Sequence, residues 1–160
     1  MEISKLNNNI TPSGTMAISN KARILKEQGK PVIGFGAGEP DFPTPSHVID
    51  EVKIASENPA YHKYTAVGGL PILRDEISRT TKKYSNFEID PDNVVVTNGG
   101  KQAILTTFMS LLDPGDEVLI PSPYWTTYPE AVKISGGDPV VVDTDFENDF
   151  KVTVEQLEEK

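Results

Sequence analysis

Three runs of consecutive branched apolar residues, separated by stretches long enough for a helix, constrain the fold of this 160-residue chain more than any other feature. The runs occupy residues 94–96, 118–120 and 140–142. Consecutive rather than alternating apolar residues are typical of strands covered on both faces. Because the expected order is strand, helix, strand, helix, strand, the sequence predicts an α/β fold with a parallel sheet and right-handed crossovers.

Helices are expected between these runs and in the first half of the chain. Residue spacing and capping signals predict them over residues 13–28, 44–56, 70–84, 100–112 and 124–135. The second of these is expected to use Thr44 as its N-cap and Pro45 as its first residue. A polar, asparagine-rich arm precedes the first helix, and residues 31–35 have the pattern of a short strand.

The composition narrows the class of protein. Acidic side chains outnumber basic ones by 24 to 15, and the resulting charge of −9 argues against a protein that coats nucleic acid or an anionic membrane. The chain has no cysteine for disulfide or thiolate chemistry, and with only two histidines a transition-metal site is not expected. No apolar run approaches the ~20 residues of a membrane span, and the polar N-terminus lacks a signal-peptide pattern. A soluble, cytoplasmic protein is expected.

The segment NGGKQA, residues 98–103, carries the strongest local signal for a ligand. A predicted strand leads through Gly99 and Gly100 into a helix, whose first backbone N–H groups and positive dipole end favour an anion such as phosphate. A tight strand-to-helix turn without a ligand explains the same residues equally well. The spacing does not fit a Walker loop. The GFGAG run at residues 34–38 lacks a following helix, so a dinucleotide-binding turn is not expected there either.

Two aromatic side chains are further candidates. Trp125, the only tryptophan, follows the second predicted strand at the edge where open α/β sheets bind ligands, and its ring could stack on a planar heterocycle. A place in the hydrophobic core is the commoner role for a single tryptophan. Tyr64 lies in a turn-rich loop before Gly68 and Gly69, where its hydroxyl could meet a ligand or its ring could simply pack.

Five motifs, taken in order, resemble those of the class I/II aminotransferases, which are pyridoxal 5′-phosphate (PLP) enzymes of fold type I. The motifs are GAGEPDF at residues 36–42, KY at 63–64 before a Gly-Gly pair, NGGKQA at 98–103, DPGDE at 113–117 and SPYW at 122–125. The resemblance covers essentially the whole chain and is nearest to bacterial aspartate aminotransferases. It implies a three-layer αβα large domain with a mostly parallel sheet. Residues 45–160 would form the first part of that domain, and residues 1–44 an arm, a helix and a substrate-side loop.

The resemblance also implies roles for individual residues. The cofactor phosphate would be held at the start of a helix by Gly99, Gly100, Lys101 and Gln102. Trp125 would stack on the pyridine ring, and Tyr64 would reach the phosphate bound in the neighbouring subunit of a homodimer. Gly38 would offer its backbone N–H to the substrate α-carboxylate, and Thr15 would lie close to the substrate mouth. Lys101 does not correspond to the lysine that bonds the cofactor.

Only half of the family's cofactor site is expected in this chain. The Schiff-base lysine in a serine-rich S-x-x-K segment, the N-P-N-N-P-T-G segment, the aspartate partner of the pyridine nitrogen and the arginine for the α-carboxylate have no counterpart, so no catalytic residue is assigned. Thr153 and Gln156 predict a helix that begins just before the last residue. We therefore expect the N-terminal portion of a longer enzyme, inactive by itself.

The activity implied by the resemblance is transfer of an amino group between an L-amino acid, first of all aspartate, and a 2-oxo acid, in amino acid biosynthesis. Two alternatives stay open. One is a non-catalytic, aminotransferase-like module that senses a ligand or dimerises, although such regulators carry a basic DNA-binding domain where this chain has a short polar arm. The other is a PLP-dependent lyase or synthase of the same fold, which shares the phosphate and carboxylate sites.

Overall fold

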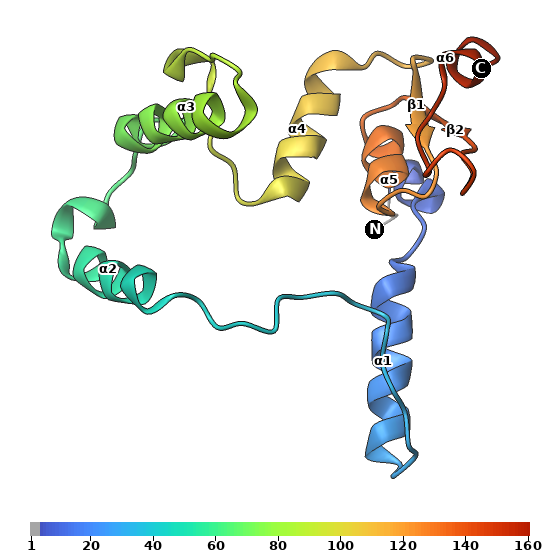
Figure 1. The fold of residues 1–160 in the computed structure, drawn as a ribbon, viewed down its shortest axis with the longest axis horizontal. Coiled ribbons are helices and arrows are strands. Elements are labelled where there is room, and N and C mark those ends of the chain that lie inside the picture. Colours follow the sequence, from blue (N-terminus) through green and yellow to red (C-terminus); the bar gives the residue numbers. More distant parts are fainter. Residues whose placement is uncertain (1–3) are drawn as a thin grey trace. The chain divides into compact units, whose positions relative to one another are not determined.

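The computed structural model describes residues 4–160, and the first three residues of the predicted arm lie outside the described residues. The chain forms two compact units. The sheet unit comprises the chain up to Ala37 together with Gly99–Lys160, and the helical unit is Gly38–Asn98. Figure 1 labels the elements of both units. The division predicted after residue 44 separates functional regions and stays a prediction.

The sheet unit is built on a parallel strand–helix–strand arrangement. β1 (Glu117–Pro121) and β2 (Asp138–Val142) pair in parallel along their whole length. The connecting helix, α5 (Thr127–Ile134), packs on both strands. Two of the four predicted strands and the helix between them are therefore confirmed, and with them the parallel α/β arrangement.

The core of the sheet unit lies where α5 covers the strands. Its buried side chains are Ile120, Ala131, Val132 and Val142. Full burial of a branched apolar side chain stabilises a fold by about 1.5–3 kcal/mol. Because successive strand residues point to opposite faces, Leu119 lies on the other face of β1, where it is 38% exposed. The apolar runs predict strands covered on both faces, but within residues 4–160 only the face of the sheet under α5 is covered.

Two further helices belong to the Gly99–Lys160 part of the sheet unit. α4 (Gly100–Leu111) precedes β1 and packs against α5. α6 (Val154–Glu158) begins with the predicted capping box, in which Thr153 Oγ1 accepts the Gln156 N–H at 3.3 Å and Gln156 Oε1 accepts the Thr153 N–H at 2.9 Å. The Gln156 amide also donates to the carbonyl of Asp143 at 3.0 Å, which ties α6 to the end of β2.

The arm and the first helix also belong to the sheet unit. A short 3-10 helix, η1 (Lys5–Asn9), leads towards α1 (Gly14–Glu27). Ser13 caps α1 by accepting the Met16 N–H at 3.4 Å. Gly29 follows the end of the helix with φ +75°, a left-handed conformation that favours glycine. This helix is confirmed as the sequence predicts it.

The helical unit contains two long helices and two short 3-10 helices. They are α2 (Ser46–Glu57), η2 (Pro59–His62), α3 (Pro71–Ser85) and η3 (Pro91–Asn93). Both long helices are predicted from the sequence, but the start of α2 differs. Pro45 rather than Thr44 is its N-cap, because the ψ of Pro45, 139°, is extended and not helical.

Two predicted strands are wrong. Residues 31–35 and 94–96 pair with no other segment within residues 4–160, so neither forms part of a sheet. The second run still makes one backbone hydrogen bond, from the Val96 N–H to the Gly68 carbonyl at 2.9 Å. An apolar run has the composition of a strand, but only a partner strand can satisfy its backbone groups as a ladder.

Candidate functional site

The amino end of α4, where the sequence predicts phosphate binding, has room for an anion. Gly99 is the N-cap, with φ +84° and ψ 169°, a conformation that strains any residue with a Cβ. A Cβ added to Gly99 or Gly100 would meet no heavy atom within 4 Å. The first turn has no acidic residue and contains Lys101. The helix dipole and the lysine thus give this end a positive potential.

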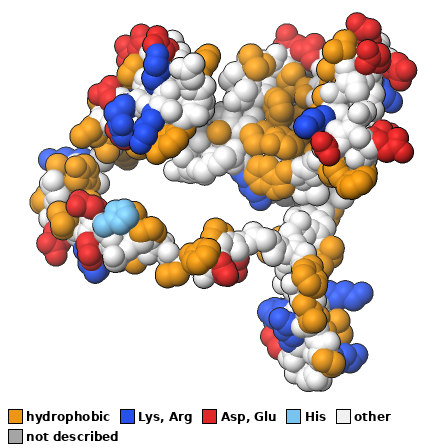
Figure 2. All heavy atoms as spheres, viewed as in Figure 1, with side chains coloured by type: hydrophobic (Ala, Val, Ile, Leu, Met, Phe, Trp, Pro, Cys, Tyr) orange, Lys and Arg blue, Asp and Glu red, His pale blue; other side chains and the backbone are white. Residues whose placement is uncertain are grey.

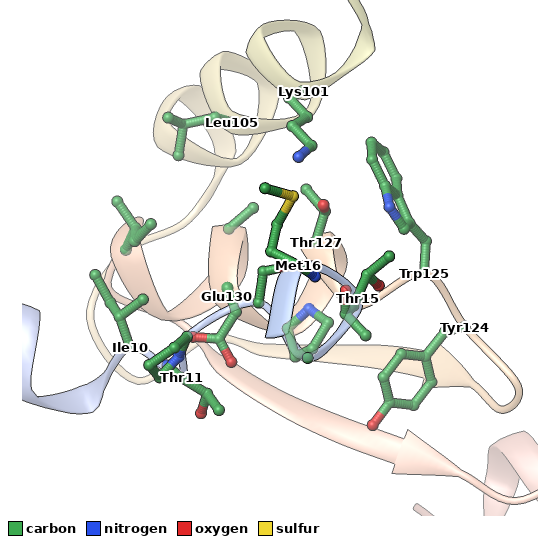
Figure 3. A pocket seen from close by; sticks show the side chains of 17 residues that line it. Ile10, Thr11, Thr15, Met16, Lys101, Leu105, Tyr124, Trp125, Thr127 and Glu130 are labelled. Carbon is green, nitrogen blue, oxygen red and sulfur yellow. The ribbon is translucent and has the colours of Figure 1, made fainter. Parts of the chain in front are cut away.

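A cavity of about 660 Å³ opens beside α4 (Figure 3). Its lining comes from three segments of the sheet unit: the arm at residues 10–16, α4, and the stretch from residue 124 to residue 134 that includes most of α5. Segments far apart in the sequence therefore enclose one space.

Lys101 and Trp125 meet in this cavity, as Figure 3 shows. The Lys101 Nζ lies 5.6 Å from the centroid of the Trp125 ring, within the range of a cation–π contact. The indole also packs edge to face against Tyr128, with ring centroids 5.8 Å apart and planes at 89°. Since Trp125 is 44% exposed, it does not occupy the core position that a single tryptophan usually takes.

Glu130 is a residue of this cavity that the sequence analysis missed. Its Oε2 accepts the Thr11 N–H at 2.9 Å, and its Oε1 accepts from the Lys133 ammonium at 3.2 Å. Burial acts to raise the pKa of Glu130, but these hydrogen bonds outweigh burial and lower the pKa below the ordinary value of 4.5. The sequence does place a lysine three residues after the glutamate on the same helix face. Nothing in that spacing indicates a distant backbone partner.

The remaining predicted site residues divide between the two units. Thr15 lies in the first turn of α1 and lines the cavity, and Gln102 lies in the first turn of α4. Gly38 and Tyr64 belong to the helical unit. The Tyr64 side chain is fully exposed, and a Cβ on Gly38 would meet nothing within 4 Å. The structure thus places Thr15 at the cavity that also contains the lysine and the tryptophan.

Other kinds of site find little support in the described part of the chain. No group of three or more His, Cys, Asp or Glu side chains within residues 4–160 is arranged to hold a metal ion. In the same residues, no helix combines the length and the apolar character needed to span a membrane.

Comparison with known sequences points to one family. The pattern of the family described as aminotransferase class I and II matches residues 30–160. The aspartate aminotransferase of Streptomyces avermitilis is 54% identical over 149 residues, which are 93% of this chain and 36% of that protein. The aspartate aminotransferase of Geobacillus stearothermophilus is 48% identical over 159 residues, 99% of this chain and 40% of that protein. The chain therefore spans less than half the length of these relatives.

Comparison with solved structures gives the same answer. The aspartate aminotransferase from Rhizobium meliloti matches with a TM-score of 0.90 and 38% identity, over 99% of this chain and 40% of that one. The Thermus thermophilus enzyme with maleate matches with a TM-score of 0.91 and 37% identity, over 99% of this chain and 41% of that one. The fold class predicted from the sequence, an incomplete α/β domain of the PLP-transferase type, is confirmed.

These findings agree with the motifs that the sequence analysis singled out. The family consists of PLP-dependent transferases, as the resemblance implied. Both the sequence pattern and the two structural matches extend over most of the chain. The chain belongs to the class I and II aminotransferases.

Proposed function

We propose that this chain supplies the phosphate and ring side of the PLP site in an aspartate aminotransferase, an enzyme that moves an amino group between L-aspartate and a 2-oxo acid. The observation that carries the proposal is the cavity in which Lys101, at the start of α4, and Trp125, after β1, meet. The names of the relatives, aspartate aminotransferases, support the choice of reaction.

The amino end of α4 fits the cofactor phosphate. Gly99, Gly100 and Gln102 lie at the start of α4, where the helix dipole favours a dianion. The open space at both glycines lets a phosphate oxygen approach the backbone closely. The Lys101 ammonium adds a full positive charge beside the same turn.

Trp125 fits the cofactor ring. Its edge-to-face contact with Tyr128 fixes the plane of the indole, and the exposed part of the ring offers a flat apolar surface. We assign the indole the task of orienting the pyridine ring by stacking. Tyr64, fully exposed on the helical unit, is assigned to the phosphate of a second copy in a cytoplasmic homodimer.

We infer a dicarboxylic substrate from the names of the relatives, aspartate aminotransferases. Among the residues that line the cavity, the one cation, Lys101, is already assigned to the cofactor phosphate, and both oxygens of the one carboxylate, Glu130, accept hydrogen bonds. That the Thermus thermophilus relative was solved with maleate, a dicarboxylate, supports this choice. Gly38 is assigned to the α-carboxylate and Thr15 to the mouth of the site.

The residues of this chain bind and orient rather than react. When bound, PLP supplies an electron-withdrawing ring that lets a proton leave the α-carbon of an amino acid. Lys101 acts as a fixed cation at the phosphate and not as the covalent anchor. We therefore expect no aspartate/2-oxoglutarate turnover by this chain alone, and no stable adduct on Lys101 after borohydride treatment with PLP.

Fluorescence of Trp125, the only tryptophan, tests the cofactor site directly. The chain is titrated with PLP, with pyridoxal as the phosphate-free control and inorganic phosphate as competitor. Gly100→Asp places a carboxylate in the first turn of α4, which favours the helix but repels phosphate, so we expect PLP affinity to fall about tenfold or more. Gly100→Ala is the matched control, because a Cβ fits there without a contact.

We expect PLP to quench Trp125 at lower concentration than pyridoxal, and inorganic phosphate to oppose PLP. Maleate added to the PLP-loaded chain is expected to change the emission again, whereas acetate is not. Equal quenching by PLP and pyridoxal, or equal PLP affinity in Gly100→Asp and Gly100→Ala, would overturn the phosphate site.

A further inference from the structure

The N-terminal arm is tied to α5 by one side chain. We define the arm segment as residues 10–16, none of which is charged. The Thr11 N–H donates to Oε2 of Glu130 at 2.9 Å. Within residues 4–160, this is the only backbone hydrogen bond between the arm segment and α5, and a side-chain hydrogen bond from Thr11 also lowers the pKa of Glu130. Since the arm segment has no charged side chain to form an ion pair, its docking depends on these contacts and on apolar packing.

The Glu130 carboxylate is held in place to receive that hydrogen bond. Its second oxygen accepts from the Lys133 ammonium at 3.2 Å, and its side chain is only 20% exposed. A hydrogen bond to an ionised acceptor in such surroundings is stronger than one between neutral groups. The ion pair with Lys133 thus orients the carboxylate, and the carboxylate in turn orients the arm.

The docked arm segment forms one wall of the cavity. Thr15 and Met16 line the space that Lys101 and Trp125 also line. Figure 3 shows Met16 directed towards Lys101, and Thr11 beside Glu130 at the opposite end of the cavity. If the arm segment left α5, the cavity would lose this wall and open to solvent.

We propose that Glu130 is a positioning residue of the site, which holds Thr11 and thereby keeps the arm segment in place as the wall facing Lys101 and Trp125. The identity of the molecule in the cavity rests on the proposed function, but the docking of the arm does not. Glu130 acts through the arm and has no contact with the reacting atoms in this role.

Four variants separate the hydrogen bond from other effects. Thr11→Pro removes the donor and leaves the carboxylate, and Ile10, with φ −91° and ψ 126°, already has the extended conformation of a residue before proline. Thr11→Ala keeps the N–H but removes the hydroxyl, which also acts on Glu130, so it separates the two contributions of Thr11. Glu130→Ala removes the acceptor, while Glu130→Gln keeps a neutral one. Glu76→Gln breaks an ion pair of the same i,i+3 spacing, with Arg79 on α3, away from the arm.

Two readouts follow the arm without any ligand: amide hydrogen exchange of Met16 and Ala17, the first hydrogen-bonded amides after Thr11, and the emission wavelength of Trp125. In Thr11→Pro and Glu130→Ala, we expect exchange about tenfold faster and emission at longer wavelength, because a charge-assisted hydrogen bond is lost. Glu130→Gln is expected to lie between these variants and the unmodified chain. Glu76→Gln is expected to behave like the unmodified chain, and Thr11→Ala to lie between the unmodified chain and Thr11→Pro.

A third readout, the PLP titration of Trp125, tests whether the arm matters for the site. The proposal is overturned if Glu130→Ala and Thr11→Pro exchange at the same rate as their controls. It is also overturned if the arm is released while PLP affinity stays the same, since Glu130 then positions nothing. Should the unmodified chain fail to respond to PLP, the proposed function fails, and the exchange rates still decide whether Glu130 docks the arm.

Discussion

The sheet unit and the helical unit bury their apolar side chains to very different extents. The sheet unit contains four residues that are at most 5% exposed: Ile120, Ala131, Val132 and Val142. Among the described residues of the helical unit, only Val94 is buried. On α2, Val52 and Ile54 are 62% and 63% exposed. Both α2 and α5 are amphipathic, but α5 buries apolar side chains and α2 buries none.

This difference has a structural cause. A pair of parallel strands offers α5 a continuous apolar surface, so strand and helix bury each other. In the helical unit, where almost no apolar side chain is buried, hydrogen bonds link one segment to another. Arg74 on α3, for example, donates to the Pro91 carbonyl at 2.8 Å and to the Asp92 carboxylate at 2.6 Å. The cavity with Lys101 and Trp125 is therefore carried by the unit that has a core.

A buried charge should expose the contrast most strongly. We expect Val132→Asp, on the buried face of α5, to lower the free energy of unfolding by more than about 3 kcal/mol, because the site offers the carboxylate no partner. We expect Val52→Asp, on the exposed part of α2, to change it by less than about 0.5 kcal/mol, since valine and aspartate have similar helix propensities. Urea unfolding followed by circular dichroism measures both.

Similar losses of unfolding free energy in Val132→Asp and Val52→Asp would contradict the difference in burial between the two units. Val132→Ala serves as the milder control, since it removes volume without adding charge. It is expected to cost about 2 kcal/mol, from two lost methyl groups and the cavity left behind.

The helical unit leaves no room for a side chain at Gly69. A Cβ at Gly69, where φ is +103°, would lie 2.7 Å from Val96 Cγ2 and 2.8 Å from Val96 Cβ. We expect Gly69→Ala to cost about 2–3 kcal/mol from backbone strain and overpacking together. Gly115→Ala, at φ +97° with no neighbour within 4 Å, should cost only the strain of about 1–2 kcal/mol.

The amide of Val96 reports on this contact, because it donates to the Gly68 carbonyl at 2.9 Å. Its hydrogen exchange should accelerate in Gly69→Ala and stay unchanged in Gly115→Ala. Equal acceleration in both variants would mean that the two units unfold together, and the comparison between them would lose its basis.

Elements set by nearby residues could be predicted from the sequence. The α1 cap at Ser13 and the α6 capping box at Thr153 depend on partners three residues away, and both are confirmed. The strand predicted at residues 94–96 is wrong because a strand requires a distant partner that composition does not specify. The start of α2 was also predicted wrongly. Residue preference favours Thr44 as the N-cap, but the extended ψ of Pro45 makes Pro45 the N-cap.

The residues of the cavity were likewise predicted where nearby residues determine them and missed where a distant contact does. Lys101 was predicted from the Gly-Gly turn that opens a helix and Trp125 from the turn after a strand, and the structure brings the Lys101 Nζ to 5.6 Å from the centroid of the Trp125 ring. Glu130 was missed because its partner is a backbone N–H 119 residues earlier in the chain. Every residue except proline has a backbone N–H, so no pattern of side chains indicates which of these groups a glutamate contacts.

The smallest expected effect compares two glutamates, one from each unit. The pKa of Glu76 is lowered chiefly by its hydrogen bond with Arg79. At Glu130 burial raises the pKa, but the hydrogen bonds from Thr11 and Lys133 prevail and lower it. Both carboxylates are ionised at neutral pH, but only Glu130 holds a distant segment. Acid should therefore release the arm through one of them and not the other.

The direction of the pH effect follows from linkage. A carboxyl whose pKa is lower when folded stabilises the docked arm above its ordinary pKa of 4.5, and that contribution is lost as the pH falls through the lowered value. We expect Trp125 emission to shift to longer wavelength in that acidic range. Glu130→Gln should abolish the shift, and Glu76→Gln should leave it intact.

The other groups around Glu130 must be separated from it for this result to count. Lys101 and Tyr124 line the same cavity, Lys133 shares its helix, and the arm segment contributes no titratable group. The strands beneath α5 begin with two further acidic residues, Glu117 and Asp138. If the shift survives in Glu130→Gln, one of those carboxyls controls the emission and the arm is not released through Glu130. If the emission shift disappears in Glu130→Gln and persists in Glu76→Gln, the glutamate of the sheet unit holds a distant segment and that of the helical unit does not. The two units then differ in this respect as well as in their cores.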